Sequence, residues 1–139
     1  MGLPVVHFEI VGTDPAGLRA FYGALFGWEF DVGDASTPAV SAPGEYGFVH
    51  GTANPVPDAP AVGSGAPGIN GGVAGGPDLR PRVLFYIGVP DVEAALRKAE
   101  SLGGTRRMGP EPKDAEPGAL LVGHFADPEG NVVGVAGTA

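Results

Sequence analysis

The sequence contains no cysteine among its 139 residues. Without a thiol, the protein has no disulfide, no thiolate nucleophile and no zinc site built on cysteine. Long hydrophobic runs are absent too, since no segment approaches the roughly 18 apolar residues of a membrane-spanning helix. Residues 1–4 lack the basic and apolar stretches of a signal peptide. We therefore expect a cytoplasmic protein that does not enter a membrane.

Basic residues are scarce. Lys and Arg number 8 against 16 Asp and Glu, which gives a net charge of −8. Proteins that bind nucleic acids or anionic membranes carry clustered Lys and Arg, so neither partner is expected. Glycine and proline are abundant, with 25 and 15 residues, and favour short strands joined by many turns. A 43% hydrophobic composition with 17% charged residues is typical of a globular domain.

An internal repeat organises the chain. The repeated residues are Val6, Phe8, Ile10, Asp14, Leu25 and Gly27, which return 77 positions later as Val83, Phe85, Ile87, Asp91, Leu102 and Gly104. A second echo, the sequence GVAG, occurs at residues 72–75 and again at residues 134–137. We interpret residues 1–139 as one domain that contains two modules, residues 1–76 and 77–139.

The first module has the pattern of a strand followed by a helix and further strands. Residues 5–11 alternate between two faces, as in a strand. Asp14 is a good helix N-cap, Pro15 suits the first helical position, and Gly27 suits the end of the helix. Three more strands are predicted over residues 28–32, 45–50 and 69–74.

Residues 51–68 separate two of these strands and are predicted to be a loop. Twelve of the 18 residues are Gly, Pro or Ala, and only Asn54 and Asp58 offer polar chemistry. Loops of this length are usually either functional or mobile, and both interpretations stay open here.

The second module repeats the same order of elements. Residues 82–89 are a predicted strand, and Asp91 caps a predicted helix that ends at residues 103–104. The expected buried stripe of this helix consists of Val92, Ala95, Leu96, Ala99 and Leu102. Three further strands are predicted over residues 105–108, 119–125 and 132–136, with a structural turn at residues 127–131.

Three short motifs stand out: HFEI at residues 7–10, LFGW at residues 25–28 and FADPEGN at residues 125–131. In their order and spacing they resemble motifs of the vicinal-oxygen-chelate superfamily, which includes glyoxalase I, bleomycin-resistance proteins and extradiol dioxygenases. The resemblance covers nearly the whole chain and implies an α+β fold of two tandem βαβββ modules. It further implies that the curled mixed sheets of the modules enclose a shared cleft, and that the protein forms a homodimer.

Metal-dependent members of that family place His or Glu ligands on the first and last strands of each module. The four matching positions here hold His7, Gly72, Leu84 and Gly134. One imidazole needs two or three further donors to hold a divalent ion firmly, so no metal cofactor is expected. A shifted metal site that uses His50 or His124 is the alternative.

His7 and Glu9 are the candidate catalytic residues. They share one face of the first strand, and the family cleft would surround them with Leu84, Tyr86 and the two glycines. A polar pair on an apolar wall must be hydrogen-bonded or solvated. The pair therefore either transfers protons and orients a ligand, or is a bonded relic without chemistry.

Gly72 and Gly134 are candidate ligand-binding positions together with His7, Glu9, Leu84 and Tyr86. The glycines either widen a pocket for a flat ligand or record a simple loss of metal ligands. Arg80, Arg82, Arg106 and Arg107 are expected to be solvated. The candidate aromatic walls of a pocket are Trp28, Phe30, Tyr46, Phe48 and Tyr86.

Three functions are consistent with this sequence. The first is metal-free binding of a small aromatic or amphipathic molecule, similar to the bleomycin-resistance branch of the family. The second is an enzyme of the lyase, isomerase or dioxygenase type that uses an altered metal site or His7 and Glu9. The third is a protein-interaction module whose cleft is vestigial.

Overall fold

The computed structural model describes residues 1–58, 63 and 65–138, which fall into two compact units. The first, called the N-terminal unit, consists of residues 7–35 and the described part of residues 40–83. The second, called the C-terminal unit, consists of residues 1–6, 36–39 and 84–138. Within the C-terminal unit, the amide of Gly88 donates a hydrogen bond of 2.9 Å to the carbonyl of Pro4, which attaches the first residues of the chain.

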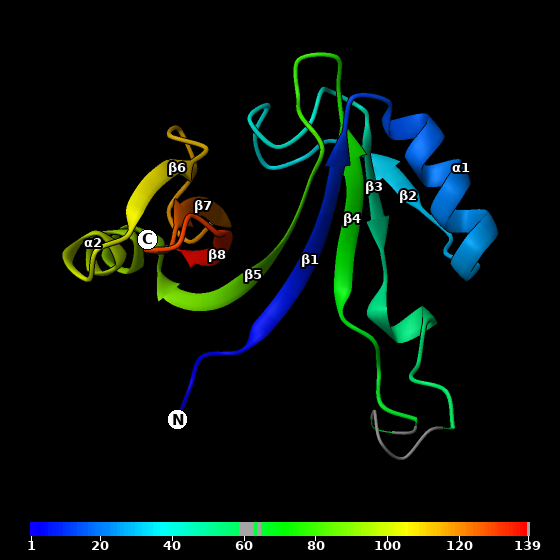
Figure 1. Cartoon of the computed structure of the whole chain (residues 1–139), viewed down its shortest axis with the longest axis horizontal. Helices are drawn as coiled ribbons and strands as arrows, with labels where there is room; N and C mark the ends of the chain where they lie inside the picture. The colour runs from blue at the N-terminus through cyan, green and yellow to red at the C-terminus, as the bar shows by residue number, and fades with distance from the viewer. Residues whose placement is uncertain (59–62, 64, 139) are drawn as a thin grey trace. The chain divides into compact units, whose positions relative to one another are not determined.

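The N-terminal unit is a mixed sheet with one α-helix against it (Figure 1). Its strands lie in the order β2-β3-β4-β1, with β1 parallel to β4 and the other pairs antiparallel. The elements are β1 (Val5–Gly12), α1 (Pro15–Phe26), β2 (Asp31–Gly33), β3 (Tyr46–Val49), the short 3₁₀ helix η1 (Gly51–Ala53) and β4 (Asn70–Gly75).

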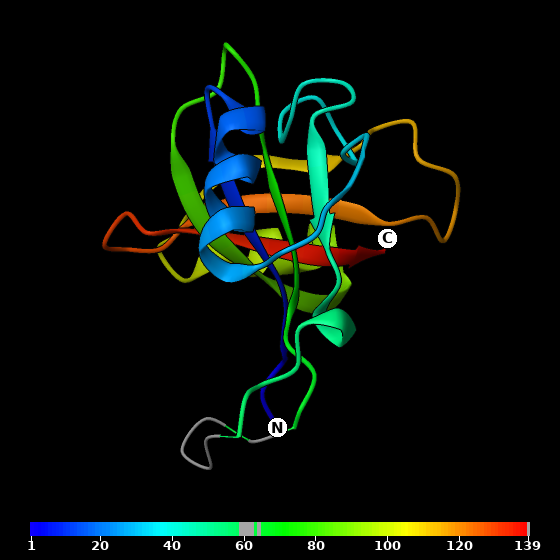
Figure 2. The same cartoon turned by 90° about the vertical axis from the view of Figure 1, so that its right-hand side faces the viewer.

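The C-terminal unit repeats this topology in the order β5-β8-β7-β6, with β5 parallel to β8. Figure 2 shows β8, β7 and β6 running side by side in red, orange and yellow. The predicted α+β fold of tandem βαβββ modules is therefore confirmed. The elements are β5 (Arg82–Asp91), α2 (Val92–Ser101), β6 (Thr105–Glu111), β7 (Leu121–Ala126) and β8 (Val132–Thr138).

The predicted caps of both helices are confirmed. The Asp14 carboxylate accepts a hydrogen bond of 3.1 Å from the amide of Gly17, and Gly27 ends α1 with a left-handed φ of 73°. The Asp91 carboxylate accepts one of 2.9 Å from the amide of Ala94. Each N-cap contributes about 0.5–2 kcal/mol, so these residues fix where the helices begin.

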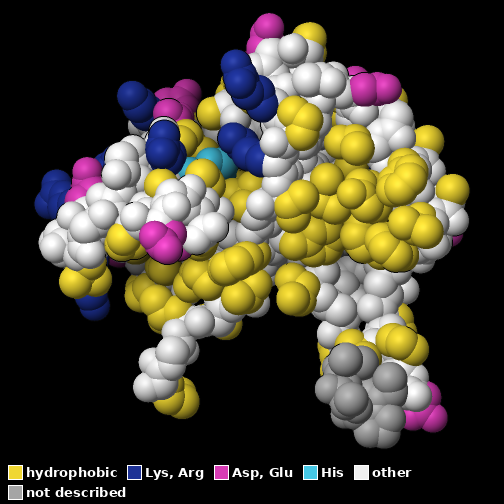
Figure 3. All heavy atoms as spheres, in the orientation of Figure 1, with side chains coloured by type: hydrophobic (Ala, Val, Ile, Leu, Met, Phe, Trp, Pro, Cys, Tyr) yellow, Lys and Arg dark blue, Asp and Glu magenta, His cyan; other side chains and the backbone are white. Residues whose placement is uncertain are grey.

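The two helices differ in how deeply they are buried. In α2, Val92 and Leu96 are both 0% exposed and pack with Leu121 and Val135. In α1 the apolar residues Phe21, Leu25 and Phe26 are 57–59% exposed. Hydrophobic side chains are visible on the part of the surface that carries α1 (Figure 3).

Two local predictions are wrong. Leu102 does not belong to the buried stripe of α2, because it occupies the C-cap after the last helical turn and is 71% exposed. The predicted strand over residues 28–32 is reduced to β2, which begins only at Asp31. Trp28 instead turns its ring toward Phe8 and Tyr22, with centroids 5.2 and 5.7 Å apart.

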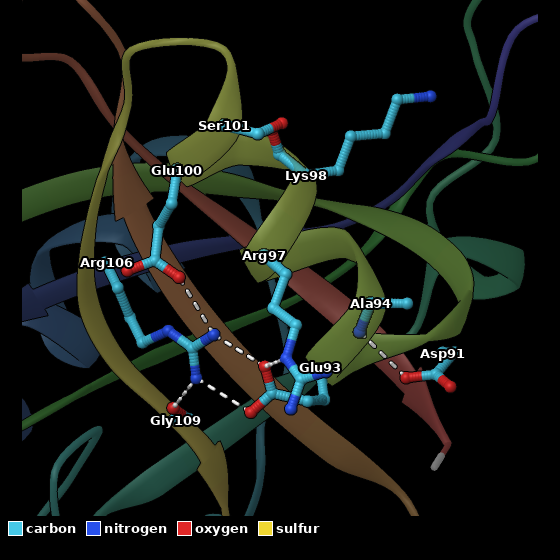
Figure 4. Close-up of polar contacts among 9 residues, drawn as sticks. All are labelled: Asp91, Glu93, Ala94, Arg97, Lys98, Glu100, Ser101, Arg106 and Gly109. Carbon is cyan, nitrogen blue, oxygen red and sulfur yellow. Dashed lines mark hydrogen bonds and ion pairs between the residues drawn. The ribbon is translucent and has the colours of Figure 1, made fainter.

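Arg106 forms ion pairs that join β6 to α2, in contrast to its expected solvated state (Figure 4). Its guanidinium donates to both carboxylate oxygens of Glu93 at 2.8 and 2.6 Å, and to Glu100 at 3.0 Å. Arg97 donates to Glu93 at 3.1 Å. The hydrogen bond from Arg106 lowers the pKa of Glu93, so the pair stays ionised near neutral pH.

The turn at residues 127–131 is held by its own side chains, as predicted. The Asp127 carboxylate accepts three hydrogen bonds of 2.9 Å, two from the amides of Glu129 and Asn131 and one from the Asn131 side chain. These bonds lower the pKa of Asp127, with the Asn131 side chain as the largest cause.

The predicted loop over residues 51–68 is only partly described. It begins with η1, and the Asn54 side-chain amide donates a hydrogen bond of 2.9 Å to the carbonyl of His50. Residues 59–62 and 64 lie outside the described residues. In the described part of the chain, no helix has the length and apolar character needed to cross a membrane.

Candidate functional site

His7 and Glu9 lie on one face of β1, as the alternation predicts. His7 is half-buried, and Glu9 is only 2% exposed. Phe8, between them, points to the other face and packs against Trp28. A buried carboxylate must be compensated by hydrogen bonds or by charge, so the neighbours of Glu9 define the site.

One partner of Glu9 is Tyr46 of β3. Its hydroxyl lies 2.6 Å from His7 Nε2 and donates a hydrogen bond of 3.0 Å to Glu9 Oε2. Tyr46 therefore bridges the two candidate catalytic residues. These three residues are called the His7–Tyr46–Glu9 cluster below.

Gly72 makes this bridge sterically possible. It lies on β4, between the β1 and β3 strands, and pairs with Glu9 on one side and Phe48 on the other. A Cβ atom at Gly72 would collide with the Tyr46 ring. The space above the glycine is therefore filled by tyrosine, and the interpretation of Gly72 as added pocket volume is wrong.

An aromatic side chain extends the cluster along the same sheet face. The Phe48 ring centroid lies 5.8 Å from that of His7, and the Tyr46 centroid lies 6.3 Å from it. Both aromatic residues are partly exposed. Of the five predicted aromatic walls, Tyr46 and Phe48 thus join His7, while Trp28 packs with Phe8 and α1.

His7 is a neutral imidazole near pH 7. Burial lowers the pKa of its ring below the usual value of about 6.5, because the charged form loses hydration inside the protein. Since a carboxylate can only accept hydrogen bonds, the Tyr46 proton goes to Glu9. With that direction, the His7 tautomer that fits the 2.6 Å contact carries its hydrogen on Nε2 and donates it to the Tyr46 oxygen.

The C-terminal unit contains a matching pair, Tyr86 and His124. The Tyr86 hydroxyl lies 2.7 Å from His124 Nε2, and both residues are 2% exposed. Gly134 pairs with Tyr86 on one side and His124 on the other, and a Cβ at Gly134 would collide with the Tyr86 ring. Added pocket volume is therefore also the wrong interpretation of Gly134.

The histidine and the tyrosine of the pair stand on opposite strands in the two modules. In the N-terminal unit His7 stands on the first strand and Tyr46 on the third strand of the module. In the C-terminal unit Tyr86 stands on the first strand and His124 on the corresponding later strand, β7. Each unit thus holds a tyrosine–histidine hydrogen bond across a glycine.

The four family ligand positions do not fit a divalent metal. His7 Nε2 is hydrogen-bonded to Tyr46, Gly72 and Gly134 have no side-chain donors, and both glycines are covered by tyrosine rings. Leu84 is 4% exposed and packs against Tyr86 and Val122. Among residues 1–58, 63 and 65–138, no group of three or more His, Asp or Glu side chains is placed to hold a metal ion.

Sequence reasoning missed the hydrogen-bonding roles of Tyr46 and His124. The sequence predicts Tyr46 only as an aromatic wall, because a separation of 39 residues from His7 leaves no local signal of their contact. The one available signal was the matched pair Gly72 and Gly134. A glycine in the middle of a strand often marks the close approach of a bulky neighbour, which here is a tyrosine ring in both units.

Two surface hollows lie apart from these residues within their units. One of about 670 Å³ in the C-terminal unit is bordered by Glu93, Arg106 and the segment from Pro110 to Leu121. One of about 380 Å³ in the N-terminal unit is bordered by Glu29, Asp31 and His50, among others. Phe30, a predicted aromatic wall, and His50, a residue of the alternative metal site, border the second hollow. The six predicted ligand-binding residues border neither hollow: His7, Glu9, Gly72, Leu84, Tyr86 and Gly134.

The family of the chain follows from its sequence. The model of the glyoxalase-like domain matches residues 7–136. The chain therefore belongs to the glyoxalase-like family of the vicinal-oxygen-chelate superfamily, as its motifs predict. A comparison with curated protein sequences finds no match.

Solved structures with the same fold include enzymes. A Streptomyces coelicolor methylmalonyl-CoA epimerase variant with 2-nitronate-propionyl-CoA has a TM-score of 0.60 at 13% identity, over 99% of both chains. A Vibrio splendidus 12B01 member of the glyoxalase/bleomycin resistance/dioxygenase superfamily has a TM-score of 0.55 at 16% identity, over 98% of this chain and 99% of that one. The Mycobacterium tuberculosis methylmalonyl-CoA epimerase has a TM-score of 0.55 at 16% identity, over 97% of this chain and 87% of that one. At these identities the likeness establishes the fold.

Proposed function

We propose that this chain binds a small aromatic or amphipathic molecule at the His7–Tyr46–Glu9 cluster without a divalent metal. The observation that carries the proposal is the position of Tyr46, whose ring covers Gly72 and whose hydroxyl joins His7 to Glu9. Small-molecule sites usually combine an aromatic or apolar wall with a few polar groups, and here the partly exposed Phe48 lies beside the polar cluster.

Metal titration tests the metal-free part of the proposal. The protein is treated with EDTA, dialysed and titrated with Co²⁺, Ni²⁺ and Zn²⁺ by isothermal calorimetry. We expect dissociation constants weaker than about 1 mM, because a single imidazole supplies too few donors. A 1:1 site with a dissociation constant below about 10 μM that is lost in His7→Ala would contradict the proposal.

Ligand screening tests the binding part. A library of aromatic compounds is screened by thermal shift, and each hit is repeated on Tyr46→Phe and on the control Tyr22→Phe. Tyr22 lies on α1, where its ring stacks with Trp28. We expect hits whose stabilisation is lost in Tyr46→Phe and kept in Tyr22→Phe. Hits unaffected by Tyr46→Phe would place binding elsewhere, and the lack of any hit would favour an interaction module.

Proton transfer is a second candidate function. The hydrogen bonds from His7 through Tyr46 to Glu9 form a continuous path between a neutral imidazole and a buried carboxylate. Such a path suits the removal of a proton next to a carbonyl group. Methylmalonyl-CoA epimerases share the fold, so methylmalonyl-CoA is a reasonable first substrate to test.

Exchange of the substrate α-proton in D₂O, followed by NMR, measures this activity directly. We expect exchange by the wild type that disappears in Glu9→Gln and persists in the control Glu29→Gln, whose carboxylate lies elsewhere in the N-terminal unit. No exchange above the buffer rate would exclude this substrate. Equal rates in the wild type and Glu9→Gln would exclude Glu9 as the base.

We also propose that the chain forms a homodimer. Support comes from α1, where Phe21, Leu25 and Phe26 are 57–59% exposed and Arg19 is the only charged residue. Exposed apolar residues that gather on one surface often mark a protein interface. Analytical ultracentrifugation is expected to give a dimer that dissociates in Phe21→Glu. A wild-type protein that stays monomeric at about 100 μM would contradict the proposal.

A further inference from the structure

We propose that the hollow of about 670 Å³ in the C-terminal unit is a second small-molecule site, whose ligand is a zwitterion with an apolar side group, such as an aromatic amino acid. All the residues that border this hollow lie between Glu93 and Leu121, within the C-terminal unit. His7, Tyr46 and Glu9 are not among them, so the site goes beyond the function proposed above.

The hollow lies on the sheet face that α2 covers. Leu121 borders it and packs with Val92 of α2. The next residue of β7, Val122, points to the other face, because successive side chains of a strand alternate. There it packs with Leu84 and Tyr86. The sheet therefore separates the hollow from the face that carries the family ligand position Leu84.

One wall of the hollow is an ion pair that is already complete. The Arg106 guanidinium donates to both carboxylate oxygens of Glu93, at 2.8 and 2.6 Å, and to the carbonyl of Gly109 at 3.4 Å (Figure 4). It also donates to Glu100 at 3.0 Å. Each terminal nitrogen of Arg106 thus has two protein partners, so this wall supplies shape rather than a charge for a ligand.

The loop that borders the hollow is held in place by turns and by packing. The amide of Ala115 donates a hydrogen bond of 3.3 Å to the carbonyl of Pro112, and the amide of Ala119 donates one of 3.0 Å to the carbonyl of Glu116. Ala115 also packs against the buried cluster that contains Val92. Walls that are fixed before binding lose little conformational freedom when a ligand enters.

Apolar side chains make up much of the remaining lining: Pro110, Pro112, Ala115, Pro117, Ala119 and Leu121. Proline rings are rigid and have no N–H group that needs a hydrogen bond. Such a surface suits an apolar or aromatic group of a ligand. The volume of the hollow also falls in the range of roughly 300–1,000 Å³ that is usual for small-molecule sites.

Two charged side chains of the lining are available to a ligand. Lys113 and Glu116 border the hollow from the loop, and neither has an ion pair or a side-chain hydrogen bond to residues 1–58, 63 and 65–138. A ligand with both a carboxylate and an ammonium group gives each of them an opposite charge. A ligand with a single charge serves only one of the two, so the lining favours a zwitterion.

A matched set of compounds tests the proposal. L-phenylalanine carries the ring and both charges, phenethylamine lacks the carboxylate, hydrocinnamate lacks the ammonium group, and glycine lacks the ring. Each is titrated into the ¹⁵N-labelled full chain, and the amide shifts of Lys113, Gly118 and Leu121 are followed by NMR. We expect L-phenylalanine to bind about three-fold tighter than either singly charged compound, the modest gain of one exposed ion pair. Glycine is expected to give no saturable shift.

Two variants assign the charges of the ligand to the two side chains, which are both exposed and can be replaced without disturbing the core. Lys113→Gln should abolish the preference for L-phenylalanine over phenethylamine and keep its preference over hydrocinnamate. Glu116→Gln should do the reverse. The matched controls Lys98→Gln and Glu129→Gln change the net charge in the same way away from the hollow, and should keep both preferences.

Three results would overturn the proposal. Equal affinities for L-phenylalanine, phenethylamine and hydrocinnamate would contradict the zwitterion, and preferences that persist in both Lys113→Gln and Glu116→Gln would place their origin elsewhere. The lack of a saturable shift at residues 113, 118 and 121 with L-phenylalanine up to about 20 mM would exclude the site itself. The His7–Tyr46–Glu9 cluster is tested separately, by the loss of ligand binding in Tyr46→Phe.

Discussion

The N-terminal and C-terminal units contain the same pair of side chains in different surroundings. Both place a tyrosine–histidine hydrogen bond across a glycine, at 2.6 Å between His7 and Tyr46 and at 2.7 Å between His124 and Tyr86. In the N-terminal unit His7 and Tyr46 are partly exposed and the hydroxyl also reaches Glu9. In the C-terminal unit both members are 2% exposed.

This difference in exposure is the basis for the functional role that we propose for the N-terminal pair and the structural role that we expect of the C-terminal one. A partly exposed pair that is hydrogen-bonded to a carboxyl group can contact a ligand and exchange one of the pair's own hydrogen bonds for a bond to that ligand. A buried pair mainly satisfies its own polar atoms, which would be costly to leave without partners. The helix of the C-terminal unit is also the more deeply buried one: α2 buries its apolar face, whereas α1 exposes much of its own apolar face. The C-terminal unit is thus expected to depend more on packing.

The largest expected effect is on helix packing. Leu96→Ala removes a side chain that is 0% exposed and should cost about 2–5 kcal/mol of unfolding free energy through lost contacts and a cavity. Leu25→Ala on α1 should cost under about 1 kcal/mol, because Leu25 is 57% exposed. Urea denaturation at low protein concentration measures both. Similar losses of unfolding free energy from the two substitutions would show that the two helices contribute equally to stability, which would contradict this prediction.

The two glycines give the next largest effect. A Cβ at Gly134 meets the ring of the buried Tyr86, so Gly134→Ala should cost about 1–3 kcal/mol. Gly72→Ala should cost less, because the partly exposed Tyr46 can rotate outward. Gly33→Ala is the control, since nothing lies within 4 Å of its Cβ. Combining Gly134→Ala with Tyr86→Ala should remove the added cost, and a cost that persists would place the clash elsewhere.

Removal of the hydroxyl groups distinguishes the roles of the two pairs. Tyr86→Phe should lower stability by about 1 kcal/mol, the net value of one hydrogen bond. Tyr46→Phe should cost about 1–3 kcal/mol, because it removes two hydrogen bonds, one of them to the buried Glu9. Only Tyr46→Phe should also weaken the binding of ligands found by thermal shift. Calorimetry of both variants with the same ligand makes the comparison. Equal losses of affinity would mean that Tyr86 contributes to binding as much as Tyr46 does.

The smallest expected effect is on the pH dependence of stability. The pKa of His7 is lowered by burial, so between about 6.5 and the lowered value the unfolded chain takes up a proton that the folded chain does not. The contribution of neutral His7 to the free energy of unfolding is therefore fully present above about pH 6.5. It is lost as the pH falls through the pKa that His7 has in the folded protein. Denaturation from pH 7.5 to 5 should show a steeper loss for the wild type than for His7→Gln. Parallel curves would contradict this assignment.

The sequence determined the topology and the ends of the helices. The repeat, the strand alternation and the caps at Asp14 and Asp91 depend on residues close together in the chain, so their pattern is readable without the fold. The retained His7 and the missing ligands at Gly72, Leu84 and Gly134 also followed from the repeat, because matching positions can be compared directly. The place of His7 and Glu9 on one strand face followed from the period of two.

Only the tertiary structure decided what fills the space above the glycines. Tyr46 lies 39 residues from His7, and Tyr86 lies 38 residues from His124, so neither contact has a local signal. The structure also decided how far each helix is buried, which left Leu102 and much of α1 exposed despite apolar side chains. Such contacts depend on which strands become neighbours and how deeply each face is covered. Both are properties of the assembled sheets, whereas the repeat is a property of the chain.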